Sequence, residues 1–136
     1  MNIRNMKIED YYEVYQLWQK CGISLGKSDS KEEIQKFIFM NPETSMVGTI
    51  DNKIIGCVLG GYDGRRGLIH HLAVHPDYQG NDYGTILMEC LENKFKENGV
   101  VKVSFWVQNS NIGVVDFYEK LGYELRKDIV TISKVL

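Results

Sequence analysis

The sequence is poor in cysteine and proline and has no long apolar run. Among its 136 residues there are two prolines and three cysteines, Cys21, Cys57 and Cys90. Because the cysteines are odd in number, widely spaced and without a C-x-x-C pair, neither a disulfide framework nor a zinc site is expected, and a reducing cytoplasm fits best. No stretch is long enough to span a bilayer, and the first residues are not followed by the apolar run of a signal peptide.

The chain also has no large excess of positive or of negative charge. The formal net charge is −2, so neither nucleic acid nor an anionic membrane is predicted as the main partner. Apolar residues make up 43% and charged residues 25% of the chain, an ordinary composition for a globular protein. The length predicts a single domain over residues 1–136.

Periodic apolar residues separated by glycine and polar turns predict the secondary structure. Ser30, followed by Glu33, forms a capping-box pattern at the start of one helix, and Asp51-Asn52 is typical of a tight hairpin. Helices are expected at about Glu9–Cys21, Lys31–Met40, Gly84–Asn98 and Ile112–Leu121. Strands are expected near Ile3 and at Ser45–Ile50, Lys53–Gly61, Leu68–Val74, Val101–Val107, Tyr123–Arg126 and Ile129–Lys134.

The order of these elements predicts the fold class. A strand and two helices come first, then three strands, a helix, a strand, a helix and a final pair of strands. Meandering strands followed by strand–helix alternation predict an α/β (α+β) domain. We expect a mixed, twisted central sheet of six to seven strands with about four helices on both faces.

One segment combines features of an anion-binding site. A strand ending at Val74 leads into the polar turn at Gln79–Asp82 and directly into a helix through Tyr83, Gly84 and Thr85. The N–H groups at a helix start have no partner inside the helix, and with the helix dipole they favour a phosphate or pyrophosphate. The glycines alone are a weak signal, and a plain strand-to-helix loop remains the alternative.

Two motifs resemble those of the GCN5-related N-acetyltransferase (GNAT) superfamily. Gln79-Gly80-Asn81-Asp82-Tyr83-Gly84 is similar to its acetyl-CoA signature, Q/R-x-x-G-x-G/A, and Asn111 through Tyr118 to Tyr123 is similar to its N-x6-Y-x-K-x-G-F/Y block. Ile3-Arg4 followed by Glu9-Asp10 is also typical. The turn Gly60–Gly64 resembles that of small bacterial members of the YpeA type. The resemblance spans nearly the whole chain, in the right order.

The resemblance implies acetyl-CoA as co-substrate, a GNAT fold with a splay between the fourth and fifth strands, and no metal. The strand beside the splay would pair with the pantetheine arm, the helix entrance would hold the pyrophosphate, and Asn111 would bond the arm. The residues implied in cofactor binding are Leu72, Ala73, Val74, Gln79, Gly80, Asn81, Asp82, Tyr83, Gly84, Thr85 and Asn111.

Asp82 departs from the motif, which usually has glycine there. Its amide is still available, and Asp tolerates positive φ better than most residues but less well than glycine. Its carboxylate is a like charge beside a bound pyrophosphate, and it could cap the helix and compete for the same N–H groups. We therefore expect weaker CoA binding than in a glycine variant.

The resemblance also implies direct attack by an amine on the thioester, so Cys57 and Cys90 are not proposed as nucleophiles. Tyr118 is the candidate general acid for the leaving thiolate, because a phenol has a pKa near ~10 and a thiol is not far away. The alternative for Tyr118 is a purely structural aromatic residue.

The base is a choice between a histidine and water. Strand alternation sends His70 and His71 to opposite faces, with His70 on the face of Leu68 and Leu72. His70 falls where the serotonin N-acetyltransferase branch carries a catalytic histidine, and its ordinary pKa suits a base at neutral pH. A structural histidine with water chains as base is the alternative. His75 is expected to be a turn residue, and the histidine spacing does not suit a metal site.

The resemblance implies that the acceptor is an amine of a small molecule or of a protein, at its N-terminus or at lysine. In the family, the region corresponding to Ile23–Met40 shapes the acceptor side. Arg65 and Arg66 could attract an anion or could be solvated loop charges. A CoA-binding regulatory module with little turnover, transfer of a longer acyl group, and a homodimer all remain open.

Overall fold

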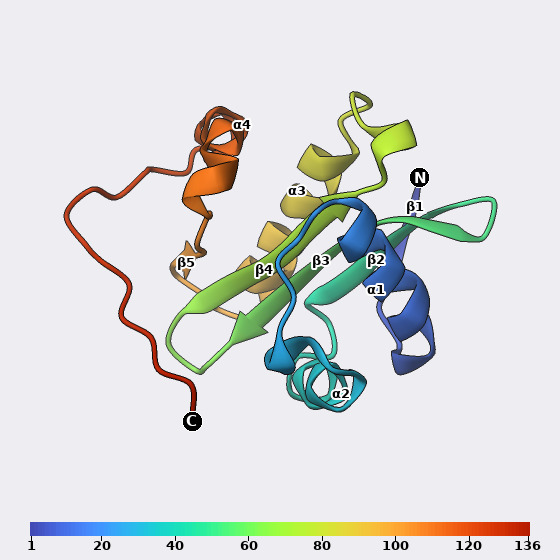
Figure 1. The fold of residues 1–136 in the computed structure, drawn as a ribbon, viewed down its shortest axis with the longest axis horizontal. Coiled ribbons are helices and arrows are strands. Elements are labelled where there is room, and N and C mark those ends of the chain that lie inside the picture. The colour runs from blue at the N-terminus through green and yellow to red at the C-terminus, as the bar shows by residue number, and fades with distance from the viewer. The chain divides into compact units, whose positions relative to one another are not determined.

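The computed structural model describes residues 1–136, which divide into two units, residues 1–105 and 106–136 (Figure 1). The second unit has one α-helix, α4 (Val115–Lys120), preceded by a 3-10 segment at Asn109–Val114. The elements of the first unit are β1 (Asn2–Asn5), α1 (Tyr11–Lys20), α2 (Lys31–Met40), β2 (Ser45–Ile50), β3 (Lys53–Tyr62), β4 (Gly67–Val74), α3 (Tyr83–Glu97) and β5 (Val103–Ser104). No helix is both long and apolar enough to cross a membrane.

The first unit is built on one sheet with strands in the order β1-β2-β3-β4-β5. Neighbouring strands from β1 to β4 are antiparallel, and β4 and β5 are parallel. Asp51 and Asn52 both have positive φ, 50° and 63°, as a two-residue hairpin turn with the twist of its strands requires. The sequence prediction of this hairpin and of its two strands is confirmed.

Strand β4 leaves its parallel neighbour soon after it starts. The pairing with β5 is limited to Gly67 with Val103 and Leu68 with Ser104, whereas β4 continues to Val74. Along its second half, the edge of β4 that faces away from β3 therefore has no strand paired with it. This geometry matches the expected splay, although β5 is shorter than the predicted strand Val101–Val107.

The sheet has five strands, and the expectation of six to seven was wrong. The segments Tyr123–Arg126 and Ile129–Lys134 have no strand. Their apolar residues alternate as a strand requires, but a strand also needs a neighbour for its backbone groups, and alternation says nothing about that neighbour. Ile129 and Ile132 are 62% and 91% exposed.

Helices cover both faces of the sheet, as two neighbouring glycines on β3 show. A Cβ on Gly60 would meet Leu91 and Phe95 of α3, whereas one on Gly61 would meet Phe37 of α2. Since successive residues of a strand point to opposite faces, α3 lies on one face and α2 on the other. Trp18 of α1 is in the same buried cluster as Cys57 and Leu59, so α1 shares the face of α2. Figure 1 shows this arrangement, with α3 behind the strands.

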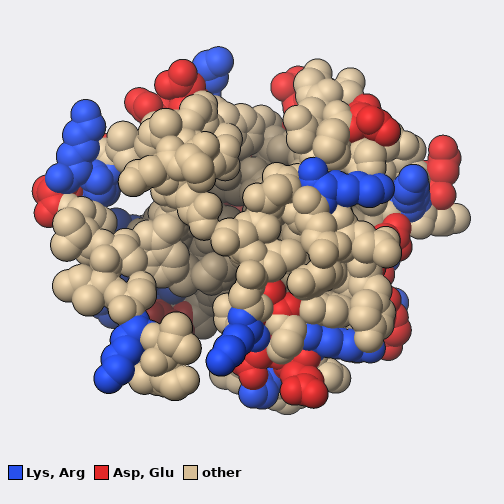
Figure 2. All heavy atoms as spheres, in the orientation of Figure 1, with Lys and Arg blue, Asp and Glu red and all other residues tan.

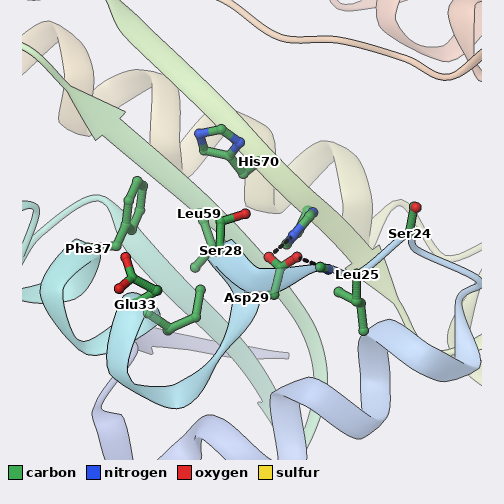
Figure 3. A pocket seen from close by; sticks show the side chains of 11 residues that line it. Ser24, Leu25, Ser28, Asp29, Glu33, Phe37, Leu59 and His70 are labelled. Carbon is green, nitrogen blue, oxygen red and sulfur yellow. Dashed lines mark hydrogen bonds and ion pairs between the residues drawn. The ribbon is translucent and has the colours of Figure 1, made fainter. Parts of the chain in front are cut away.

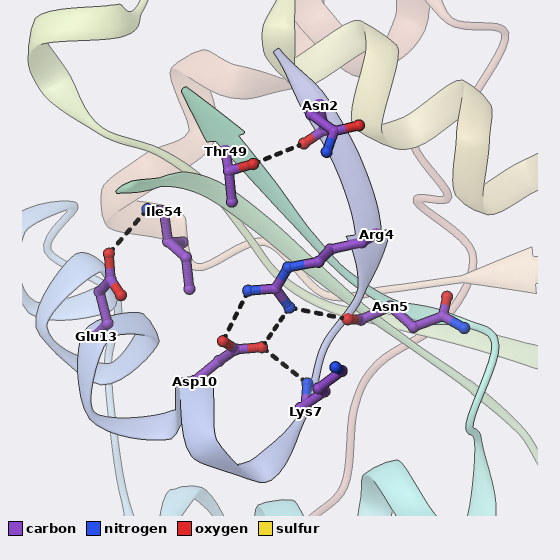
Figure 4. A network of polar contacts seen from close by, with 8 residues as sticks. All are labelled: Asn2, Arg4, Asn5, Lys7, Asp10, Glu13, Thr49 and Ile54. Atoms are coloured by element: carbon purple, nitrogen blue, oxygen red, sulfur yellow. Dashed lines mark hydrogen bonds and ion pairs between the residues drawn. The ribbon is translucent and has the colours of Figure 1, made fainter. Parts of the chain in front are cut away.

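A polar clamp holds the start of α1 against β1 (Figure 4). The guanidinium of Arg4 donates two hydrogen bonds to the carboxylate of Asp10, at 2.7 and 2.9 Å, and the N–H of Lys7 donates to the same carboxylate at 2.8 Å. The Arg4 guanidinium, with the Lys7 N–H, holds the pKa of Asp10 below its usual range despite partial burial. The first predicted helix therefore begins after this turn, at Tyr11 rather than Glu9.

The other two long helices of the first unit begin and end close to their predicted bounds. The side chain of Ser30 accepts a hydrogen bond from the N–H of Glu33 at 3.3 Å, which confirms Ser30 as the cap of α2. Charged side chains of both signs are interspersed on the face drawn in Figure 2, in keeping with the small net charge.

Candidate active site

The exit of β4 is a fixed turn that delivers the chain to α3. The N–H of His75 donates to the C=O of Ile55 at 2.7 Å, and Pro76–Tyr78 form a single 3-10 turn. The side chain of Gln79 folds back and donates to the C=O of Val74 at 2.9 Å. The amide of Asn81 donates to the C=O of Tyr78 at 3.0 Å. The turn is thus held by its own side chains.

The first turn of α3 is not capped by a side chain. Asp82 is its N-cap residue and lies in the left-handed region, with φ 60° and ψ 12°, and its carboxylate makes no capping hydrogen bond. The first bond of the helix runs from the N–H of Ile86 to the C=O of Asp82 at 3.0 Å. The N–H groups of Tyr83, Gly84 and Thr85 precede that bond and have no acceptor within the helix. The competing cap considered for Asp82 is absent.

The cofactor edge implied on β4 is partly occupied. On the β3 side, Ala73 and Val74 pair with Cys57 and Gly56. The C=O of Val74 also accepts from Gln79 and, at 3.3 Å, from the thiol of Cys21. A ligand arm that uses this carbonyl must displace one of these two donors, because a carbonyl has two lone pairs.

A bulge in β4 places His70 and His71 on the same side of the sheet. Leu59 pairs with His70 and Cys57 with Ala73, so two residues of β4 lie opposite Val58 alone. His71 takes up the extra residue in the left-handed region, with φ 52°. The prediction that alternation sends the two histidines to opposite faces was wrong, because the period of two fails at a bulge.

Both histidines line a cavity of about 470 Å³ on the face covered by α1 and α2. Figure 3 shows His70 on β4, Phe37 and Glu33 on α2, and Asp29 on the turn before that helix. The full lining consists of Ser24, Leu25, Gly26, Ser28, Asp29, Glu33, Ile34, Phe37, Leu59, His70 and His71. Its size is in the range of small-molecule sites. Arg65 and Arg66, in the β3–β4 turn, are not part of the lining.

His70 is a half-buried imidazole in the cavity wall. Its ring meets the ring of Phe37 edge-on, with centroids 5.7 Å apart. Burial lowers the pKa of His70, and the neighbouring His71 lowers it further, against a smaller opposite effect of Asp29. A neutral ring nitrogen in a cavity is able to accept a proton from a bound molecule.

His71 is held by a buried carboxylate. Its Nε2 lies 2.6 Å from Oδ1 of Asp29, whose other oxygen accepts from the N–H of Gly26 at 2.8 Å. The C=O of Asp29 accepts from the hydroxyl of Tyr11 at 2.6 Å. The His71 ring packs edge-on against Trp18, with centroids 4.8 Å apart. Three contacts, from Gly26 in the same turn and from Tyr11 and Trp18 on α1, therefore fix the pair in position.

Cys57 supports this network and is not a nucleophile. It is fully buried, and its sulfur accepts a hydrogen bond from the indole N–H of Trp18 at 3.0 Å. Burial raises the pKa of Cys57 to about 12, so the thiol stays protonated. The expectation that this cysteine carries no covalent chemistry agrees with its surroundings.

Asn111 and Tyr118 belong to the second unit. Asn111 lies in the 3-10 segment before α4, and its N–H donates to the C=O of Gln108 at 2.8 Å. Tyr118, on α4, packs edge-on against Phe117 and Tyr123, with ring centroids 5.0 and 6.1 Å away. Burial raises the pKa of the Tyr118 phenol, which therefore remains a proton donor over a wider pH range.

Sequence reasoning missed Asp29. It precedes the N-cap of α2 in an ordinary polar run, Lys27-Ser28-Asp29-Ser30, which is typical of any helix start. Its function depends on a contact with His71, 42 positions further along the chain. The only local signal is a carboxylate in the region Ile23–Met40 that the family resemblance associates with the acceptor.

Comparisons with known proteins all find acetyltransferases. The model of the acetyltransferase (GNAT) family matches residues 11–123. An acetyltransferase of Sodalis glossinidius is 33% identical over 136 residues, which is 100% of this chain and 96% of that protein. An acetyltransferase of Yersinia pseudotuberculosis is 36% identical over 130 residues, 96% of this chain and 92% of that protein.

Solved structures show the same fold at lower identity. Ard1 from Thermoplasma volcanium superposes with a TM-score of 0.82 at 23% identity, over 92% of this chain and 83% of that one. PaiA N-acetyltransferase from Thermoplasma acidophilum, in complex with coenzyme A, has a TM-score of 0.82 at 19% identity, over 94% of this chain and 92% of that one.

Proposed function

Because the chain belongs to the GNAT acetyltransferase family, we propose that it transfers the acetyl group of acetyl-CoA to an amine by direct attack. The observation that carries this proposal is the uncapped first turn of α3 behind the left-handed Asp82. It offers main-chain donors to a diphosphate. The strand before this turn, β4, carries His70, which lines the cavity.

The proposed carrier site runs from β4 to α3. The pyrophosphate is bound by main-chain N–H groups between Gln79 and Thr85, and the helix dipole adds to the attraction for its charge. The pantetheine arm pairs with β4 between Leu72 and Val74, where that strand has left β5. Asn111, which the family resemblance implicates, is a further candidate to bind the arm.

The proposed chemistry exchanges the C–S bond of the thioester for a C–N bond, with proton transfers at the amine and at the thiolate. His70 takes a proton from the acceptor ammonium, and the amine nitrogen then attacks the thioester carbonyl carbon. The C–N bond forms and the C–S bond breaks, and the thiolate takes a proton from the hydroxyl of Tyr118. The nitrogen, which still carries two protons after the attack, releases one to solvent to give the neutral amide, and solvent returns a proton to the phenolate of Tyr118 and takes one from His70. The lowered pKa of His70 favours its neutral form and the raised pKa of Tyr118 favours its protonated form, and the same shifts make His70 a weaker base and Tyr118 a weaker acid.

Thiol release tests this function. The protein is incubated with acetyl-CoA and a panel of amines, and the free thiol and the acetylated product are measured in the same reactions. We expect thiol release that depends on the amine and matches the amount of N-acetylated product. CoA binding with no thiol release for any amine would instead favour a regulatory module, an alternative that the comparisons do not support.

A further inference from the structure

The lining of the cavity includes acidic residues and histidines but no lysine or arginine. It contains two carboxylates, Asp29 and Glu33, and two imidazoles, and none of its eleven residues is lysine or arginine. Its walls also include Leu25, Ile34, Phe37 and Leu59, which are apolar. A ligand bound there meets apolar surface and two carboxylates, and no lysine or arginine belongs to the lining.

The carboxylate of Asp29 is fixed in the cavity wall by the fold. Asp29 is 7% exposed, and both of its carboxylate oxygens accept hydrogen bonds within the protein. The two oxygens of this carboxylate are held by the N–H of Gly26 and by Nε2 of His71. Burial and the neighbouring His71 lower the pKa of His70, which favours the neutral form of that imidazole. The carboxylate of Glu33 is partly exposed, and Nζ of Lys36, one turn further along α2, lies 2.7 Å from it.

This arrangement discriminates between two kinds of amine. An ammonium group is attracted by Asp29 and can donate to ring nitrogens and to the hydroxyls of Ser24 and Ser28. A carboxylate on the carbon next to that ammonium would lose water without gaining a cation, and it would face Asp29 at short range. Like charges brought together in a partly desolvated site repel strongly.

Building on the proposed acetyl transfer, we propose that this cavity selects acceptors whose reacting amine has no anionic group on the neighbouring carbon. The substrate class is thus aliphatic or aralkyl amines with an apolar body, and free α-amino acids are excluded. Asp29 is the residue that determines this specificity, and it acts through its charge and through the orientation of His71.

Matched acceptor pairs test the proposal. Isoamylamine and L-leucine differ only in the α-carboxylate, and so do phenethylamine and L-phenylalanine. We expect kcat/KM to be on the order of 100-fold higher for the amine of each pair. Leucinamide has nearly the size of leucine without its charge, so it is expected to approach isoamylamine. Equal kcat/KM within a pair, or leucinamide as poor as leucine, would overturn the proposal.

Variants assign the effect to the cavity. In Asp29→Asn, which keeps the size of the side chain, the preference for isoamylamine over leucine is expected to fall at least tenfold. Glu33→Gln and Glu32→Gln are a matched pair, since both are exposed on α2 but only Glu33 lines the cavity. The preference should fall about twofold to threefold in the first and stay unchanged in the second. Equal effects in Glu33→Gln and Glu32→Gln would overturn the assignment. This comparison also decides the matter if Asp29→Asn does not fold.

Failure of this proposal is distinguishable from failure of the proposed function. If no amine gives thiol release, the proposed function falls, and selectivity is then measured as binding of isoamylamine and leucine to the protein saturated with CoA. Tighter binding of isoamylamine, followed by changes in the His71 ring signals in NMR spectra, supports the proposal. Equal affinities, or no binding of either compound, overturn it.

Discussion

The rings of His70 and Phe37 meet edge-on, with centroids 5.7 Å apart, although one lies on β4 and the other on α2. The contact removes water from the imidazole, and burial is the largest cause of its lowered pKa. His71, the next residue along the bulged strand, lowers the pKa further. A histidine of this kind stays neutral to lower pH than an ordinary one, whose pKa is near ~6.5.

The pH profile of kcat/KM tests His70 as the base. Since only the neutral imidazole accepts a proton, activity should fall on the acid side with a midpoint below the ordinary histidine value of ~6.5. His70→Gln should lower kcat/KM by about 100-fold and remove that limb. His75→Gln, outside the cavity, is the control. A loss of less than about threefold in His70→Gln would favour water as the base.

Local patterns predicted the first 100 residues of the fold well. The hairpin at Asp51-Asn52 needs only two residues that tolerate positive φ, and the start of α2 needs only Ser30 to accept from Glu33. Both depend on neighbours within a few positions of the chain. Such features are encoded locally, so the sequence alone indicates them.

Features that depend on distant partners were predicted less well. The alternating residues of Ile129–Lys134 satisfy a strand pattern, yet the structure has no strand there, because pairing is not a local property. The bulge at His71 changes which side of β4 each histidine faces, and nothing in His70-His71 signals it. Asp29 enters the site only through the packing of its turn against β4.

Replacing Tyr118 separates acid catalysis from cofactor binding. Burial raises the pKa of the phenol, so its proton is retained through neutral and mildly alkaline pH and is available to the thiolate. In Tyr118→Phe we expect kcat to fall about 100-fold and the Kd for CoA to change less than twofold. Steady-state kinetics and calorimetric titration measure the two. Tyr12→Phe, on an exposed position of α1, should leave both unchanged; a normal kcat in Tyr118→Phe would refute the role.

Replacing Asp82 tests whether this residue weakens the binding of CoA. Its exposed carboxylate adds negative charge at the entrance of α3, and its left-handed backbone is easier for glycine. We expect CoA to bind about threefold to tenfold more tightly to Asp82→Gly at low salt, with a smaller gain at high salt. Asp82→Asn removes the charge but keeps a residue that tolerates this conformation, so it isolates the electrostatic part. Unchanged or poorer affinity in Asp82→Gly would contradict the prediction.

The clamp between Arg4 and Asp10 should make stability depend on acid pH. The pKa of Asp10 is lowered in the folded state, so its contribution is complete above the unfolded value of ~3.9 and is lost as pH falls through the folded value. Asp10→Asn should lower the free energy of unfolding by about 1 kcal/mol at pH 7, because Arg4 is partly exposed and the pair is screened. Urea denaturation should show this difference shrinking toward low pH. Glu9→Gln, an exposed neighbour, is the control, and a difference independent of pH would contradict the assignment.

Gly60 lies at a close approach of β3 and α3, and an added methyl group there tests the packing on the face of the sheet opposite the cavity. A Cβ at this position would lie 2.5 Å from Cδ1 of Leu91, 2.8 Å from Cζ of Phe95 and 2.9 Å from the C=O of Thr44. The first two atoms can move, but the third is backbone, and the side chain of Thr44 also donates to the C=O of Gly60 at 2.7 Å. Gly60→Ala should therefore lower the free energy of unfolding by about 2–3 kcal/mol, measured by urea denaturation. Gly113→Ala, with nothing within 4 Å of its added Cβ, should change it by less than about 0.5 kcal/mol. Equal stability of both variants and the wild type would mean that α3 can move away from the sheet without loss.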